Sequence, residues 1–221
     1  MSSVHHHPGE DMLWDYYRGA LAPGLGLAVS AHLELCSHCR SDLRLFDAVG
    51  GALLDNIEGV ELSESALDLA LARIERPDDS NSKKPAKTVK HPAFLAEFDL
   101  PDVLQSADIR GRYWAAPGVW IAPVYIDDAP KDSKTFLMYV RKGMVMPEHT
   151  HRGREITMML KGKFSDSKGS YAPGDFAVCD ESDCHSPAMS DEEDCMCFVA
   201  QEGSIVPKTL LGKLLQPFAR I

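Results

Sequence analysis

Apolar residues recur at helical spacing along the first third of the chain. A period of three to four residues places side chains on one helix face, so it predicts helices over residues 11–20, 25–35, 40–56 and 63–76. The Pro23-Gly24 pair ends the first run, and Ser63 with Glu64 is typical of a helix start. The expected inward-facing residues are Leu13, Trp14, Tyr17 and Leu21 in the first helix, Leu43, Phe46, Val49, Leu53 and Leu54 in the third, and Leu67, Ala70, Leu71 and Ile74 in the fourth.

The pattern changes after residue 92 to short runs rich in β-branched and aromatic residues. Residues 119–125, 135–140 and 156–160 predict strands, and turn sequences such as Ala172-Pro173-Gly174-Asp175 separate such runs. Short strands with regular turns favour a small antiparallel barrel or jelly roll. Between the two patterns, residues 77–92 are rich in Pro, Ser, Asn and Lys and predict a flexible linker.

The sequence therefore predicts a two-domain α + β fold. Residues 1–76 would form a small helical bundle, residues 77–92 a linker, and residues 93–221 an antiparallel β jelly roll or barrel. Four short helices make a marginal core, and a structural metal stabilises such a core most. A flexible linker would let the two halves move relative to one another.

The formal charge of −10 on 221 residues argues against direct binding of nucleic acid and favours a basic partner. Residues 1–76 hold twelve Asp and Glu against five Lys and Arg, so most of this charge lies there. No apolar run approaches the roughly 20 residues that span a bilayer, and the N-terminus lacks the pattern of a signal peptide. We expect a cytoplasmic protein whose six cysteines are reduced.

A histidine and two cysteines follow one another at spacings that suit a metal site. His32, Cys36 and Cys39 would share one side of a helix where it runs into a turn. Tetrahedral zinc needs one further ligand, and the run His5-His6-His7 could supply it by folding back. The alternatives are two buried thiols or a redox dithiol, and His38 is expected to be exposed rather than a ligand.

A second group of candidate ligands lies among the predicted strands. His149 and His151 alternate along a strand and so point the same way, Glu155 follows a tight turn, and His185 comes from a later segment. Three imidazoles and one carboxylate suit Zn²⁺, Fe²⁺, Mn²⁺ or Ni²⁺, and these ligand types do not choose among the four ions.

Three further cysteines lie close to this second group in the sequence. Cys195 and Cys197 would face the same side of a late strand, and Cys184 adjoins His185. Buried cysteine usually acts as a small apolar residue. An oxidant-sensing role is the alternative, because thiolates near a cation are reactive.

The stretch from Gly143 to Gly162 matches the first cupin motif, G-x5-H-x-H-x3-E-x6-G, at every fixed position. His185 resembles the histidine of the second cupin motif, although its spacing from Pro173-Gly174 is longer than in many cupins. The resemblance implies a cupin barrel that binds a divalent transition metal, zinc or another, through His149, His151, Glu155 and His185.

The two halves together resemble the ChrR-type anti-sigma factors of the zinc-binding anti-sigma family. The resemblance extends over nearly the whole chain, including Asp194-Cys195-x-Cys197 and residues 216–221. It implies that His7, at the family's distance from the first helix, completes a structural zinc site with His32, Cys36 and Cys39. It further implies that the helical domain sequesters an extracytoplasmic-function sigma factor, and that the cupin domain serves its release under oxidative signals such as singlet oxygen.

Two other functions remain open from the sequence. The three-His, one-Glu cupin also resembles metal-dependent dioxygenases of the acetylacetone-cleaving type, in which case Met158, Phe176 and Met189 would line a pocket. The N-terminal metal motif has no evident purpose in such an enzyme. A metal-storage module without a sigma partner is the third interpretation, and two differently composed sites argue against it.

Overall fold

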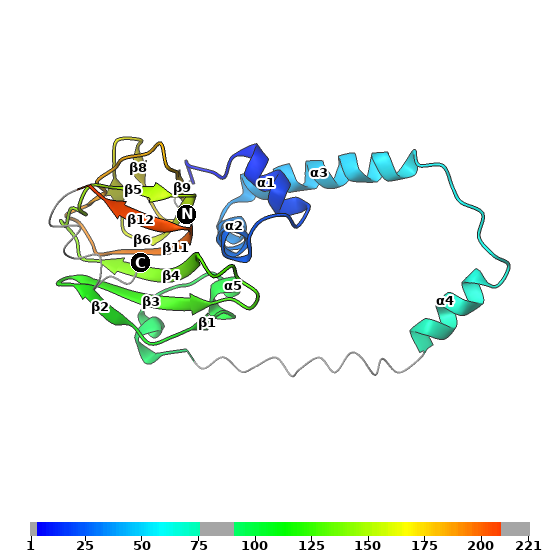
Figure 1. Cartoon of the computed structure of the whole chain (residues 1–221), viewed down its shortest axis with the longest axis horizontal. Helices are drawn as coiled ribbons and strands as arrows, with labels where there is room; N and C mark the ends of the chain where they lie inside the picture. The colour runs from blue at the N-terminus through cyan, green and yellow to red at the C-terminus, as the bar shows by residue number, and fades with distance from the viewer. Residues whose placement is uncertain (1–3, 76–90, 209–221) are drawn as a thin grey trace.

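Helices come first and β-strands follow in the computed structural model, which describes residues 4–75 and 91–208 (Figure 1). The helices are α1 (Glu10–Tyr17), α2 (Pro23–Leu35), α3 (Ser37–Asp55), α4 (Ala66–Glu75), the 3-10 helix η1 (Ala93–Glu97) and α5 (Asp102–Gln105). The strands are β1 (Asp108–Ile109), β2 (Tyr113–Ala116), β3 (Val119–Tyr125), β4 (Ser133–Val140), β5 (His149–Arg152), β6 (Glu155–Lys161), β7 (Phe164–Ser165), β8 (Ser170–Tyr171), β9 (Phe176–Cys179), β10 (Ala188–Met189), β11 (Cys195–Glu202) and β12 (Ser204–Pro207). The predicted α + β fold class is confirmed, and each predicted helix and strand overlaps an observed one.

The strands form one large antiparallel sheet and two small ones. The large sheet has the order β1-β3-β4-β11-β6-β9, with β2 paired to β3, and the small sheets are β10-β7-β8 and β12-β5. Side chains from these sheets enclose an apolar core that includes Ile121, Phe136, Met159 and Val199. The result is the small antiparallel barrel that the sequence predicts.

The outer face of the large sheet is covered by α2 (Figure 1). Along β11, Cys197 and Val199 face the barrel interior, whereas Met196 and Phe198 belong to a second apolar cluster that contains Leu25 and other residues of α2. Because β11 is buried on both faces, it reads as a continuous apolar run. Helices α1 and α2 and the first turn of α3 therefore share a core with the barrel, and this differs from the separate helical core that the sequence suggested.

The prediction that α4 has a buried, inward-facing side is wrong. α4 contains no buried residue, and Leu67, Leu71 and Ile74 are 69%, 49% and 79% exposed. The physical reason is that α4 lies apart from the barrel in Figure 1, so its apolar side packs against no other element among the described residues. The prediction for α3 and α1 is wrong in part, because the exposed residues there include Val49, Leu53, Leu54, Trp14 and Tyr17.

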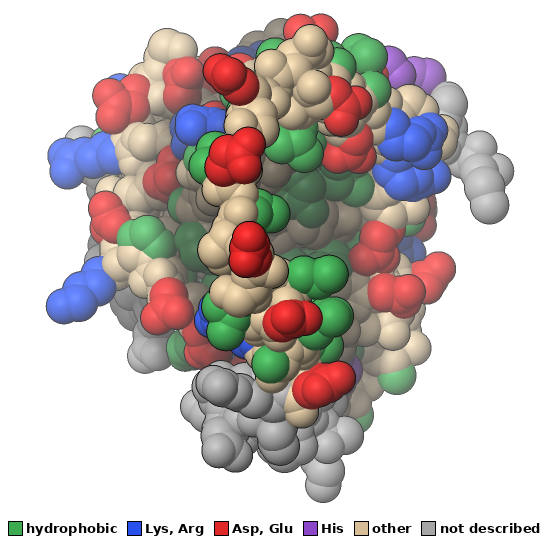
Figure 2. All heavy atoms as spheres, turned by 90° about the vertical axis from the view of Figure 1, so that its right-hand side faces the viewer, with side chains coloured by type: hydrophobic (Ala, Val, Ile, Leu, Met, Phe, Trp, Pro, Cys, Tyr) green, Lys and Arg blue, Asp and Glu red, His purple; other side chains and the backbone are tan. Residues whose placement is uncertain are grey.

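The exposed apolar residues of α3, of the segment after it and of α4 follow one another along residues 49–74, and we call this stretch the α3–α4 surface. Residues 41–75 hold eight acidic side chains and two basic ones, and Figure 2 shows acidic and apolar side chains next to one another on this side of the molecule. Isolated exposed apolar residues are ordinary, but so many within one short stretch of chain indicate an interaction surface. Its members are Val49, Leu53, Leu54, Ile57, Val60, Leu62, Leu67, Leu69, Leu71 and Ile74.

Most of the predicted linker, residues 77–90, and the family-like tail at residues 216–221 lie outside the described residues. The boundaries at 76 and 92 therefore stay a prediction. Within residues 4–75 and 91–208, no helix is both long enough and apolar enough to cross a membrane.

Candidate metal centres

Four predicted ligands meet where the N-terminal arm touches the junction of α2 and α3. Their ligand atoms, from His7, His32, Cys36 and Cys39, all lie within 4.8 Å of one another, and we call this group the N-terminal cluster. His7 Nδ1 lies 3.3 Å from Cys36 Sγ and 3.4 Å from Cys39 Sγ, and His32 Nε2 lies 3.3 Å from Cys39 Sγ. Of the three candidate histidines in the arm, His7 therefore faces the cysteines.

The local backbone explains this geometry. α2 ends at Leu35, one turn after His32, and α3 begins at Ser37, so Cys36 lies at the break between them. Cys36 Sγ accepts a hydrogen bond from the backbone N–H of Cys39 at 3.4 Å, as a helix-capping side chain does. His38, in the same motif, is exposed, as the sequence predicts, and its Nε2 lies 3.7 Å from Asp42 Oδ2.

The N-terminal cluster fits a tetrahedral zinc ion. With Zn–N bonds of about 2.1 Å and Zn–S bonds of about 2.3 Å, neighbouring nitrogen and sulfur ligand atoms would be about 3.6 Å apart, within about 0.3 Å of the observed 3.3–3.4 Å. His32 Nδ1 donates to the carbonyl of Gly174 at 2.9 Å, so the lone pair of its Nε2 points at the cluster. Burial lowers the pKa of His32 to about 4, which keeps this imidazole neutral and able to bind metal.

The second set of predicted ligands meets at one end of the barrel, and we call it the barrel cluster. His149 and His151 come from β5, Glu155 starts β6, and His185 pairs with His149 through an isolated antiparallel bridge. The ligand atoms of all four lie within 4.8 Å of one another. Gly153 has a φ of +91° in the turn between β5 and β6, a conformation that favours glycine and brings Glu155 back beside the histidines.

Hydrogen bonds fix two of these imidazoles with unprotonated Nε2 atoms facing each other. His149 Nδ1 donates to the carbonyl of Pro147 at 2.8 Å, and His185 Nδ1 donates to Asp166 at 2.9 Å. The Nε2 atoms of His149 and His185 are 3.1 Å apart, as are those of His151 and His185. Lone pairs at this separation repel unless a cation lies between them, and about 3.0 Å is the spacing of adjacent nitrogen ligands around a six-coordinate ion.

The carboxylate of this cluster also points to a cation. Burial raises the pKa of Glu155 to about 8, and its close ionisable neighbour is His151, whose Nδ1 lies 3.5 Å away. Burial likewise lowers the pKa of His151 to about 4, so this imidazole is neutral at pH 7 and supplies no positive charge to the Glu155 carboxylate. A divalent ion would compensate the buried carboxylate, and this donor set is compatible with zinc, iron, manganese or nickel.

Two residues beside this cluster were missed by the sequence analysis. Asp166 and Cys179 lie on the far side of His185 from the other ligands, with Cys179 Sγ 3.7 Å from His185 Nδ1. Asp166 lies in the turn between β7 and β8 and Cys179 ends β9. Nothing in the local sequence marks either residue, because only the pairing of distant strands brings them to His185.

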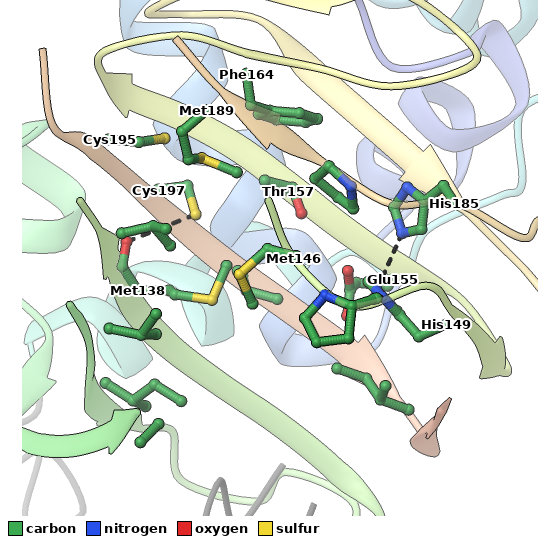
Figure 3. A pocket seen from close by; sticks show the side chains of 18 of the residues that line it. Met138, Met146, His149, Glu155, Thr157, Phe164, His185, Met189, Cys195 and Cys197 are labelled. Carbon is green, nitrogen blue, oxygen red and sulfur yellow. Dashed lines mark hydrogen bonds between the residues drawn. The ribbon is translucent and has the colours of Figure 1, made fainter. Parts of the chain in front are cut away.

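An apolar cavity of about 160 Å³ adjoins the barrel cluster, as Figure 3 shows. His149, Glu155 and His185 line one part of it, and Cys195 and Cys197 line another. Burial raises the pKa of the Cys195 thiol to about 12, so both cysteines fit the interpretation as small buried apolar residues. Cys184 is exposed. Of the expected pocket residues, Met189 lines the cavity, whereas Met158 and Phe176 pack in the cluster beneath α2.

Two family models match the chain, one over each half. A model described as a putative zinc finger matches residues 10–40, which include three of the four residues of the N-terminal cluster. A model described as the ChrR cupin-like domain matches residues 101–204, which include the whole barrel cluster.

Two known proteins match over most of the chain, and a third matches over about half of it. The anti-sigma-E factor ChrR of Cereibacter sphaeroides is 30% identical over 219 residues, covering 99% of this chain and 100% of that protein. The crystal structure of Rhodobacter sphaeroides SigE in complex with the anti-sigma ChrR matches with a TM-score of 0.67 and 28% identity, over 90% of this chain and 100% of that one. An RmlC-like cupin protein from Ralstonia eutropha matches with a TM-score of 0.41 and 18% identity, over 48% of this chain and 70% of that one.

Proposed function

Because this chain belongs to the ChrR family of anti-sigma factors, we propose that it binds an extracytoplasmic-function sigma factor through residues 1–76 and keeps it from RNA polymerase. A change at the barrel cluster under an oxidative signal would then release the sigma factor. Family membership makes the chain a regulator rather than an enzyme, so the dioxygenase alternative is set aside.

The α3–α4 surface is the observation that carries this proposal. Its exposed leucines, isoleucines and valines lie within residues 41–75, which carry eight acidic and two basic side chains. A partner with apolar grooves and a basic surround would bury this region, and the charge would steer the encounter. Sigma factors present basic surfaces to DNA and polymerase, which makes them suitable partners. The acidic surface also makes direct binding of this chain to nucleic acid unfavourable.

The N-terminal cluster has a structural part in this proposal. Cys36 lies at the junction of α2 and α3, and Cys39 is in the first turn of α3. A zinc ion held by both cysteines with His7 and His32 would therefore fix the direction in which α3 leaves the barrel. Since α3 carries part of the α3–α4 surface, the metal would hold that surface in its binding geometry.

The barrel cluster is the proposed site of the oxidative signal. Three imidazoles and one carboxylate around a buried centre would hold zinc or another divalent transition metal. The adjoining cavity offers oxidisable thioether sulfur atoms in Met146 and Met189. Oxidation there would change the packing of β11, whose outer face contacts α2.

Reconstitution tests the sequestration. The full chain is mixed with the extracytoplasmic-function sigma factor encoded in the same genome, and complex formation is measured together with transcription by that sigma factor and core RNA polymerase. A stable complex that stops transcription supports the proposal. Active transcription at saturating amounts of the chain contradicts it, whatever other protein the chain captures. Localisation to the cytoplasm, where the polymerase works, is part of the same proposal. Cell fractionation tests it.

Release is tested on the reconstituted complex with a photosensitiser that makes singlet oxygen. The unmodified complex should resume transcription on illumination. The double variant His149→Ala/His151→Ala should still inhibit transcription but fail to resume it, because it lacks two barrel ligands and keeps the whole N-terminal cluster. Equal release from both complexes would remove the barrel cluster from the signalling step while leaving the sequestration intact.

A further inference from the structure

The N-terminal arm lies along the turn that precedes β9. The backbone N–H groups of His5 and His6 both donate to Asp175 Oδ1, at 2.6 and 3.0 Å. In return, the backbone N–H of Phe176 donates to the carbonyl of His6 at 3.1 Å. The arm is thus paired to the barrel one residue before His7, a ligand of the N-terminal cluster.

Asp175 depends on the arm for its partners. The residue is 1% exposed, and its second oxygen accepts from the backbone N–H of Ala172 at 2.9 Å and faces His6 Nδ1 at 3.4 Å. Burial alone would raise the pKa of Asp175, yet the N–H donors of Ala172, His6 and His5 bring it below its usual value. Without these donors the buried carboxylate would be unsatisfied and would destabilise the fold, so the arm and Asp175 hold each other in place.

The same turn supports the second imidazole of the N-terminal cluster. The carbonyl of Gly174 accepts from His32 Nδ1 and so sets both the tautomer and the ring orientation of this ligand. Gly174 has a φ of +93°, and a Cβ atom there would lie 2.7 Å from Val4 Cγ2. Gly174 therefore holds the imidazole of His32, and its neighbour Asp175 holds the arm that carries His7.

β9 leads from this turn to the barrel cluster. Its first residue, Phe176, pairs with the arm, and its last residue, Cys179, contacts His185 and lies opposite Glu155 in the ladder with β6. A strand of four residues spans about 10 Å between its end Cα atoms. One short strand thus has the arm at one end and two ligands of the barrel cluster at the other.

We propose that the Gly174–Asp175 turn is an outer support of the N-terminal metal site, and that β9 couples this site to the barrel cluster. The inference rests on the proposed function in taking the N-terminal cluster as a zinc site. It assigns a positioning role to Asp175, a residue that touches no metal ligand side chain. Loss of such support lowers metal affinity by about 10- to 100-fold. Coupling between the binding free energies of two sites is reciprocal, so metal at the barrel cluster would tighten zinc binding at the N-terminal cluster.

Zinc release from the full metal-loaded chain to a chromophoric chelator tests the positioning role. The variant Cys36→Ser/Cys39→Ser identifies which kinetic phase belongs to the barrel cluster. Asp175→Asn should release N-terminal zinc about 10- to 100-fold faster, because an amide cannot accept all three N–H bonds. The matched control is Asp194→Asn, which removes a carboxylate that accepts from Tyr139 and Lys142 elsewhere in the barrel. Its release rate should equal that of the unmodified chain.

A second pair of variants tests the arm without altering the barrel. His5→Pro removes the backbone N–H that donates to Asp175, whereas His5→Ala keeps it. Zinc should leave the proline variant faster than the alanine variant. If Asp175→Asn and His5→Pro both release zinc at the unmodified rate, the turn does not support the site.

The coupling is tested by combining Asp175→Asn with His149→Ala/His151→Ala. The barrel variant alone should speed N-terminal release, and it should add little to the rate of Asp175→Asn, because both act through the same turn. Multiplicative effects would overturn the coupling. The sigma factor plays no part in these measurements. A chain whose N-terminal cluster holds no zinc contradicts the proposed zinc domain, whereas zinc that is bound but indifferent to Asp175 contradicts only this inference.

Discussion

Asp166 holds His185 by a hydrogen bond of 2.9 Å from the imidazole Nδ1 to the carboxylate Oδ2. The Asp166 side chain is 1% exposed, and its other oxygen accepts from the backbone N–H groups of Lys168 and Gly169. The turn between β7 and β8 thus fixes Asp166, and Asp166 fixes the ring of His185 with Nε2 toward His149. A carboxylate behind a ligand histidine raises its basicity and orients it toward metal.

We therefore expect Asp166→Asn to weaken metal binding at the barrel cluster by about 10- to 100-fold. Equilibrium dialysis of the full chain against a metal buffer measures this affinity. The control is Asp180→Asn, in the neighbouring loop, whose carboxylate accepts from Ser182 and from no barrel ligand in the hydrogen bonds described for this part of the chain. An Asp166→Asn chain that binds metal as tightly as the control would contradict the role of Asp166.

The ligand sets could be predicted because their spacing is local. His32, Cys36 and Cys39 lie within eight residues, and His149, His151 and Glu155 within seven. Helix and strand periodicity places such neighbours on one side regardless of the rest of the fold. His185 was expected from a later segment of the chain, whereas the choice of His7 among the three N-terminal histidines came from the family resemblance, and the structure brings both residues to their clusters.

The supports of these ligands could not be predicted. Asp166, Gly174 and Asp175 belong to turn sequences that occur in many proteins, and their contacts bridge 19 to 170 positions along the chain. Only the strand order of the barrel determines which turn faces which histidine. The exposure of Leu67 and Ile74 was missed for a different reason, since an apolar stripe predicts burial but does not say whether the covering surface lies in the same chain.

Cys36→Ser/Cys39→Ser should remove about one equivalent of zinc per chain and weaken sigma binding, because α3 would lose its anchor to the arm and to α2. Elemental analysis and titration with the sigma factor measure the two effects. His38→Ala is the matched control inside the same motif, since His38 is exposed and outside the cluster. Retained zinc and unchanged sigma binding in the double serine variant would refute the assignment of these cysteines.

The stability of the barrel should depend on pH through Asp194. The hydrogen bond from the Tyr139 hydroxyl, at 2.6 Å, and one from the backbone N–H of Lys142 hold the pKa of Asp194 below its usual value. A depressed carboxyl pKa stabilises the fold above the ordinary pKa of Asp, near 4, and this contribution is lost as the pH falls below it. Burial and the bond to Asp194 raise the pKa of Tyr139 to about 12, so its hydroxyl remains a donor throughout.

We expect Asp194→Asn to lower the free energy of unfolding by about 1–2 kcal/mol at pH 7 and by progressively less as the pH falls through 4 toward 3. Urea unfolding of the unmodified chain and of Asp194→Asn across this pH range measures the difference. The contributions of the other titrating groups are the same in both proteins and drop out of it. Trp120 stacks on Tyr139 with ring centroids 5.3 Å apart, so tryptophan fluorescence reports on this site. A difference that does not shrink toward low pH would contradict the charged hydrogen bond.

Leu67 and Leu71 in α4 separate binding from folding, because they are 69% and 49% exposed in the free chain. Leu67→Glu/Leu71→Glu should leave the unfolding transition within about 0.5 kcal/mol of the unmodified chain, as surface substitutions do. If the α3–α4 surface is the sigma-binding face, the same variant should lose at least about 2 kcal/mol of sigma affinity, measured by calorimetry. Val145→Glu, at a 63% exposed position on the barrel, is the control and should bind normally. Equal sigma affinities for both variants would place the sigma factor elsewhere, because two unpaired carboxylates buried in an interface strongly weaken binding.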